Sequence, residues 1–269
     1  MTLNSHRIAL ILRKEWKEII QQRGLVLSLI FLPIVFTILP LVILYTAGHA
    51  PESQIHGMPS SADIARIYPA LVGLSAIEQA QAFTGAPLSI LILMTPVILP
   101  SIIASYSIVG EKVNQTLEPL LATPVTTAEL LVAKILASLG PAVVITWFFS
   151  LIYIIGMRFA AVSQAVYNFI ISPAWFILLL LCAPLLALID VAATVAISSR
   201  ATDPRTAQQI SAVVILPLMA LLLGQFTGAL VLSPLVALGL SLLLALLAIV
   251  AIWVATRFFQ REVILTRWT

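Results

Sequence analysis

Long apolar runs recur six times along the chain and are separated by shorter, more polar stretches. Each run is about 20 residues long, and a helix of that length crosses the roughly 30 Å hydrocarbon layer of a bilayer because it rises about 1.5 Å per residue. The pattern therefore predicts six membrane-spanning helices. Their expected positions are residues 25–47, 88–109, 135–157, 173–198, 210–230 and 234–256.

Several of these runs contain proline, as at Pro33, Pro100 and Pro184. Proline breaks helices in water, but a membrane bundle accepts it because neighbouring helices satisfy the freed carbonyl groups. An outer-membrane barrel would instead show segments of roughly 10 residues with alternating polarity, and the sequence has no such rhythm. We therefore expect an all-α membrane protein.

The composition agrees with this fold class. Of the 269 residues, 61% are hydrophobic and only 9% are charged, and the mean hydropathy is +1.11. A soluble domain needs a far more charged surface, so the soluble classes are excluded.

The basic residues predict the orientation of the bundle. With six spans, both termini and the connections at 110–134 and 199–209 share one side, and only Arg66 and Arg158 lie on the other. Basic residues concentrate in cytoplasmic connections, so we expect a multi-pass protein of the bacterial or archaeal inner membrane with both termini in the cytoplasm. The net charge of +3 requires no nucleic-acid partner, because these residues lie along a surface of anionic lipid.

The first 24 residues form a separate element before the membrane domain at 25–269. Ile8, Ile11, Trp16 and Ile19 recur at helical spacing, and most of the intervening charges fall on the other face. This pattern is typical of an amphipathic helix that lies in the membrane interface and ends near the first span. Two roles are open for it, a simple anchor or a moving part.

The long connection at 48–87 is predicted to lie on the extracytoplasmic side. Pro69 and Gly73 interrupt its apolar spacing, which favours one or two short helices resting on the outer face as a lid or packing element. His49 and His56 lack the spacing of a metal site, and we predict no bound metal.

The polar segment at 110–134, "GEKVNQTLEPLLATPVTTAELLVAK", stands between two spans. Pro119 divides it, which predicts a first short helix over 110–118. Thr126 followed by Glu129 forms a capping box that starts a second helix. The expected result is a helix–turn–helix elbow whose leucines pack inward, while Glu111, Glu118 and Glu129 face solvent or a partner.

This segment resembles the region between the second and third spans of type-2 ATP-binding-cassette exporter permeases. In that family an acidic residue, a GTLE element, an LL.TPV element, a second acidic residue and a lysine recur. The positions that match are Glu111, Thr116, Leu117, Glu118, Leu120, Leu121, Thr123, Pro124, Val125, Glu129 and Lys134.

The resemblance implies a permease subunit with six spans, an N-terminal interfacial elbow helix and a cytoplasmic coupling helix. It implies a translocation path formed by two permease copies, or by this chain and a homologue, and two separate ATPase subunits as partners. The coupling residues that it implies are Glu111, Thr116, Glu118, Leu121, Thr123, Pro124 and Glu129.

No enzyme activity is expected of this chain itself. It contains no GxxxxGK[ST] phosphate-binding loop, so ATP and Mg²⁺ are expected at the partner ATPase and no cofactor on this chain. A membrane-embedded enzyme would show HExxH, paired intramembrane carboxylates or a nucleophile with a histidine, and the spans contain none of these.

Three residues inside the spans carry open alternatives. Asp190 lies within the fourth span, where a charge is unfavourable by about 2.5–3.5 kcal/mol. It lines the translocation path, pairs across a dimer, or makes a structural hydrogen bond to a neighbouring helix, for example to a serine or threonine. It is also the residue on which an ion-driven secondary transporter would depend. Gly224 and Gly228 form a small-xxx-small step that serves either the dimer interface or internal packing.

Overall fold

The computed structural model describes residues 4–49, 60–113, 126–198 and 204–258, and every regular element within these ranges is helical. The long helices are α1 (Ser5–Gln21), α2 (Arg23–His49), α4 (Ala76–Leu88), α5 (Thr95–Val113), α7 (Thr127–Ala160), α10 (Ala183–Ser198), α12 (Ile215–Phe226) and α13 (Pro234–Phe258). Shorter helices are α3 (Ser61–Ile67), η2 (Pro69–Leu71), η3 (Ser89–Met94), α8 (Gln164–Ile170), α9 (Pro173–Ile177), the π-helical η4 (Leu178–Cys182), α11 (Pro204–Ser211) and η5 (Ala212–Val214).

The prediction of six membrane spans is confirmed for the described residues. Six helical segments are long and apolar enough to cross a bilayer. They are Arg23–His49, Ala76–Ser107, Ala128–Ala160, Gln164–Ser198, Gln208–Phe226 and Pro234–Arg257. The chain is thus a multi-pass, all-α membrane protein.

The second span begins earlier than the sequence predicted. Helix α4 starts inside the segment assigned to the outer loop, and its residues Gln79, Gln81 and Phe83 are buried. The expectation that all of 48–87 lies outside the membrane is therefore wrong for α4, which continues through η3 into α5. Its buried glutamines bind backbone carbonyls, Gln79 that of Leu74 in the preceding turn and Gln81 that of Leu44 in α2. The predicted break is confirmed, since α3 ends at Ile67 and a turn follows at Gly73, whose φ is +87°.

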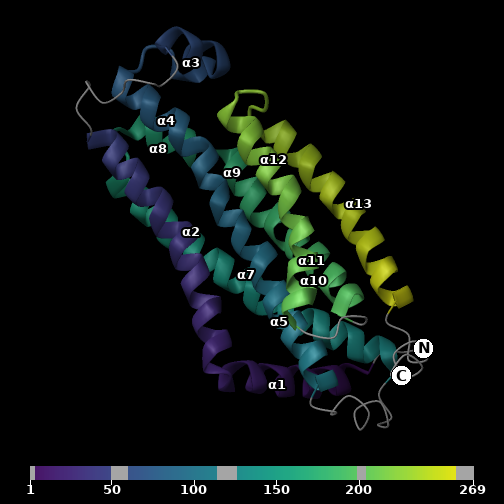
Figure 1. The fold of residues 1–269 in the computed structure, drawn as a ribbon. Helices are drawn as coiled ribbons and strands as arrows, with labels where there is room; N and C mark the ends of the chain where they lie inside the picture. The colour runs from purple at the N-terminus through teal and green to yellow at the C-terminus, as the bar shows by residue number, and fades with distance from the viewer. Residues whose placement is uncertain (1–3, 50–59, 114–125, 199–203, 259–269) are drawn as a thin grey trace.

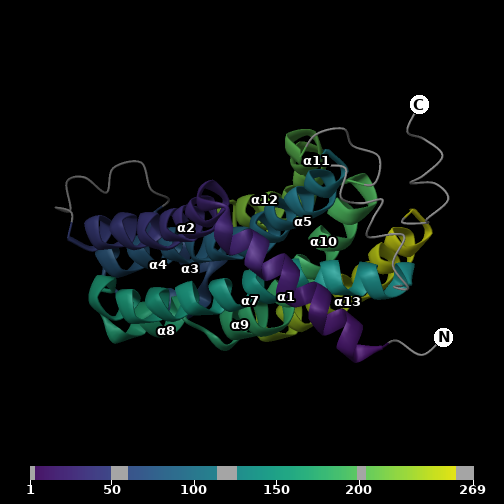
Figure 2. The same cartoon turned by 90° about the horizontal axis from the view of Figure 1, so that it is seen from below.

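Helix α10 lies near the centre of the bundle, where it packs against α5, α7 and α13. Helix α1 runs across one end of the bundle, next to the start of α2, and α3 and α8 lie at the opposite end (Figure 1). Seen from below, α1 crosses the end of the bundle over α7 (Figure 2). We call the end formed by α1, the last turns of α5 and the first turns of α7 the junction end, and the opposite end the far end.

The outer faces of the bundle are apolar. Leu27 on α2, Phe159 on α7, and Leu235 and Ile249 on α13 are all strongly exposed. Exposed apolar faces of this extent would be unfavourable in water, whereas lipid solvates them. The exposed faces thus agree with the assignment of these helices as membrane spans.

Candidate functional site

Three helices meet at the junction end, and two of them flank the predicted coupling segment. Helix α5 continues to Val113, so the start of the predicted short helix at 110–118 is an extension of the second span. Glu111 lies in this last turn, and its side chain is not described. The predicted coupling residues Thr116, Glu118, Leu121, Thr123 and Pro124 lie outside the described residues.

A buried ion pair joins the three helices. The Lys134 Nζ of α7 donates to Glu15 Oε1 of α1 at 2.9 Å and to Ser107 Oγ of α5 at 2.7 Å. The Ser107 hydroxyl in turn donates to Glu15 Oε2 at 2.6 Å. The Lys134 and Glu15 side chains are only 1% and 2% exposed. Each of the three side chains therefore binds the other two, and we call Glu15, Ser107 and Lys134 the triad.

The surroundings of this pair are apolar. Ile11 of α1 packs with Leu130 and Leu131 of α7 and with Val195 of α10 in one buried cluster. Charges removed from water are unfavourable unless they are paired and hydrogen-bonded, and the triad meets this condition. The predicted inward packing of Leu130 and Leu131 is confirmed.

Sequence reasoning missed Glu15 and Ser107 as members of this site. A signal for Glu15 was available, because it lies four residues after Ile11 and four before Ile19, on the apolar stripe of α1. An acid on such a stripe needs a buried partner. The sequence had no comparable signal for Ser107, which resembles the other serines of the spans.

A second contact ties the start of α1 to the start of α7. The predicted capping box is confirmed: Glu129 N donates to Thr126 Oγ1, and Thr126 N donates to Glu129 Oε2. Asn4 N donates to Glu129 Oε1 at 2.9 Å, and Arg7 Nη1 lies 3.8 Å from Glu129 Oε2. A carboxylate is favourable beside two helix N-termini because both present unpaired amides.

The expectation that Glu129 faces solvent or a partner is therefore wrong in this structure. Its side chain is buried under the first residues of α1. Two residues of α7 thus connect it to α1. Glu129 contacts Asn4 and Arg7, and Lys134 binds Glu15.

Asp190 lies in the middle of α10 and is 1% exposed. Its carboxylate approaches the Ser101 backbone of α5, and neither oxygen has a hydrogen-bond partner among the described residues. The hydroxyl groups of Ser105 and Ser198 on the same two helices are also buried without a partner in the described part of the chain. Asp190 faces the inside of the bundle, and its role in the translocation path or in structural bonding stays a prediction.

Gly224 and Gly228, for which a dimer interface and internal packing were both open, have close neighbours within the chain. Helix α12 ends at Phe226, so Gly228 lies beyond the helix in a left-handed turn with φ +70°. A Cβ at Gly228 would lie 2.7 Å from Ile67 of α3, and one at Gly224 would lie 3.2 Å from Leu230. A small-xxx-small face requires both residues on one helix, so the expectation of such a face is wrong and internal packing explains both glycines.

The described residues thus form six candidate membrane spans, a helix lying across one end and a bonded junction around the connection between the second and third spans. The family model described as ABC-2 family transporter protein matches residues 9–230, and the chain belongs to this family. It is accordingly a membrane permease of an ABC transporter, a class that associates with ABC ATPase subunits. Comparison with curated proteins finds no match.

Proposed function

We propose that this chain forms the translocation path of an ATP-driven exporter as a dimer with itself or a homologous permease. Two separate ATPase subunits bind ATP and Mg²⁺ and act on residues 110–134. The observation that carries this proposal is the buried triad at the junction end. It joins the elbow helix to both flanks of the coupling segment, and such a connection is what transmission of a mechanical step requires.

The geometry supports a route for that transmission. A force on the segment between α5 and α7 acts on two helix ends that Lys134 and Ser107 hold together. Because Glu15 binds both residues, α1 moves with them. Helix α7 then continues without interruption to Ala160, and its 34 residues extend for about 50 Å. A displacement at the junction end is thereby carried to the far end.

The coupling segment is proposed to face the cytoplasm. Twelve of the fourteen lysines and arginines belong to the same side as residues 110–134, as the positive-inside rule requires. An ATPase on this side reaches the segment directly, and amphipathic α1 lies in the inner interface of the cell membrane.

Reversal of the charge at Glu118 tests the coupling assignment, because it is expected to release the ATPase subunit. When the permease is purified in mild detergent with its co-expressed ATPase, Glu118→Lys is expected to reduce the bound ATPase by about tenfold or more, because a rim charge pair becomes repulsive. Asp63→Lys makes the same change on α3 at the far end and is expected to leave the ATPase bound. Equal retention in both variants would refute the proposed coupling surface.

An ion-driven secondary transporter is the second candidate, and it is favoured by the carboxylate of Asp190, which has no hydrogen-bond partner among the described residues. Under the ATP-driven proposal, Asp190→Asn should keep ATP hydrolysis by the reconstituted complex within about twofold, since it removes a titratable group but little volume. Hydrolysis should also be unaffected by an imposed proton gradient. Transport that proceeds without any ATPase, and that ends with Asp190→Asn, would establish the ion-driven mechanism instead.

A further inference from the structure

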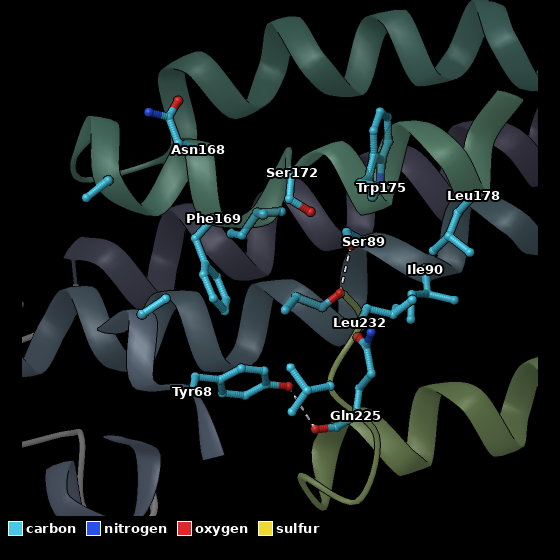
Figure 3. Close-up of a pocket in the computed structure, with 15 residues that line it drawn as sticks. Tyr68, Ser89, Ile90, Asn168, Phe169, Ser172, Trp175, Leu178, Gln225 and Leu232 are labelled. Carbon is cyan, nitrogen blue, oxygen red and sulfur yellow. Dashed lines mark hydrogen bonds between the residues drawn. The ribbon is translucent and has the colours of Figure 1, made fainter. Parts of the chain in front are cut away.

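A cavity of about 360 Å³ lies at the far end of the bundle, away from the triad. Four parts of the chain enclose it: the α3–η2 segment, the α4–η3 segment, α8 with α9, and the turn between α12 and α13. Figure 3 shows side chains from all four parts converging on it. Its volume falls in the roughly 300–1,000 Å³ range of small-molecule sites.

Aromatic rings form much of the wall. The rings of Tyr68 and Phe169 meet edge to face with their centroids 5.4 Å apart. Trp175 is buried and stacks on Tyr153 of α7 with a centroid separation of 6.0 Å. Rings held in this way present a fixed apolar surface, which binds another ring system at a low entropic cost.

Among the described residues, the polar groups of the lining are all neutral, since no lysine, arginine, aspartate or glutamate contributes to it. Gln225 is buried, and its Oε1 has no hydrogen-bond partner among the described residues. The Tyr68 hydroxyl is already engaged, because it donates to the Gln225 backbone carbonyl at 3.2 Å. Burial raises the pKa of Tyr68, which keeps this donor protonated. The side-chain oxygen of Gln225 is thus a buried acceptor to which no described residue donates.

We propose that this cavity is a binding site for a small neutral molecule that has an apolar ring system and one hydroxyl or amide N–H donor. The rings pack against Tyr68, Phe169 and Trp175, and the donor binds Gln225 Oε1. The site is built within one chain and lies at the opposite end of the bundle from the triad. It therefore stands whether or not the proposed export function is correct.

Photolabelling with 4-hydroxybenzophenone tests this site, at a pH at which the phenol is protonated. The probe is neutral and aromatic and carries one donor, and ultraviolet light attaches it to nearby C–H bonds. In the purified full-length permease we expect saturable labelling, mapped by mass spectrometry to residues 165–178 and 225–232. Benzophenone, which lacks the hydroxyl group, is expected to bind about threefold to tenfold more weakly.

Two variants address the two parts of the proposal. Ala86→Trp fills the cavity from α4 and should abolish saturable labelling. Gln225→Leu removes only the acceptor and should raise the half-saturating concentration about threefold to tenfold, while Gln209→Leu on exposed α11 should not change it. Both cavity variants are first compared with the unmodified permease for monodispersity and for the thermal midpoint of unfolding. A variant that differs in either property is recognised as misfolded.

Labelling that rises linearly with probe concentration and maps only to lipid-facing residues would overturn the site. A different outcome is saturable labelling that Ala86→Trp abolishes but that neither Gln225→Leu nor removal of the probe hydroxyl changes. This outcome would overturn the hydrogen bond assigned between the ligand donor and Gln225 Oε1.

Discussion

Replacing Lys134 with methionine is expected to lower the free energy of unfolding by about 3–5 kcal/mol, the usual effect of breaking a buried ion pair from one side. The substitution leaves the Glu15 carboxylate in an apolar cluster with the Ser107 hydroxyl as a remaining donor. Lys14 Nζ, at 4.0 Å from Glu15 Oε1 and more than one third exposed, compensates only weakly. Denaturation by sodium dodecyl sulfate in mixed micelles measures the change.

The double variant Glu15→Gln with Lys134→Met separates the pair from the surrounding packing. Both charges are then gone while the side-chain volumes are nearly kept, so we expect stability within about 1 kcal/mol of the unmodified chain. If Lys134→Met alone lowers the free energy of unfolding by less than about 1 kcal/mol, the Glu15–Lys134 ion pair is not the dominant interaction at the junction end. If the double variant is as unstable as the single one, the defect is in packing rather than charge.

The same double variant tests the mechanical role of the triad. A chain that folds without the triad has lost the ion pair between α1 and α7 and the bonds of Lys134 to α5. It keeps the apolar contacts and the contacts of Asn4 and Arg7 with Glu129. We expect it to bind the ATPase normally and to show less stimulation of transport by ATP. Unchanged ATP-driven transport would mean that the triad contributes to stability alone.

The sequence predicted the features that depend on residues close together along the chain. The six spans follow from the length of the apolar runs, and the start of α7 follows from Thr126 and Glu129, which lie three residues apart. Such signals are local, because helix length and capping are decided within a few turns.

The features that the sequence did not predict depend on distant contacts. Lys134 and Glu15 are 119 positions apart, and nothing near either residue identifies the other. Glu129 resembled a solvent-facing acid because the arrival of Asn4 and Arg7 is a tertiary event. Gly228 appeared to continue an apolar helix, although the chain turns there to pack on α3.

Helix α4 carries buried amide side chains that the sequence analysis did not identify, and Gln81 is the clearest case. This side chain is fully buried and bridges three segments at the far end. Its Nε2 donates to Leu44 O of α2 at 2.7 Å and to Ala160 O of α7 at 2.8 Å. Its Oε1 accepts from Val162 N at 2.9 Å. The carbonyl of Ala160 lies at the end of α7, where no further helical turn supplies a donor.

Gln81→Met is therefore expected to lower the free energy of unfolding by about 3 kcal/mol, because buried backbone groups lose their partners while the side-chain volume is nearly kept. Detergent denaturation again gives the value, and hydrogen exchange should show earlier opening at residues 160–163 than at the junction end. Gln164→Met, an exposed glutamine of α8, is the control and should change stability by less than about 0.5 kcal/mol. Equal effects of the two variants would show that the far end is not held by the Gln81 bridge, and that apolar packing among α2, α4 and α7 holds it alone.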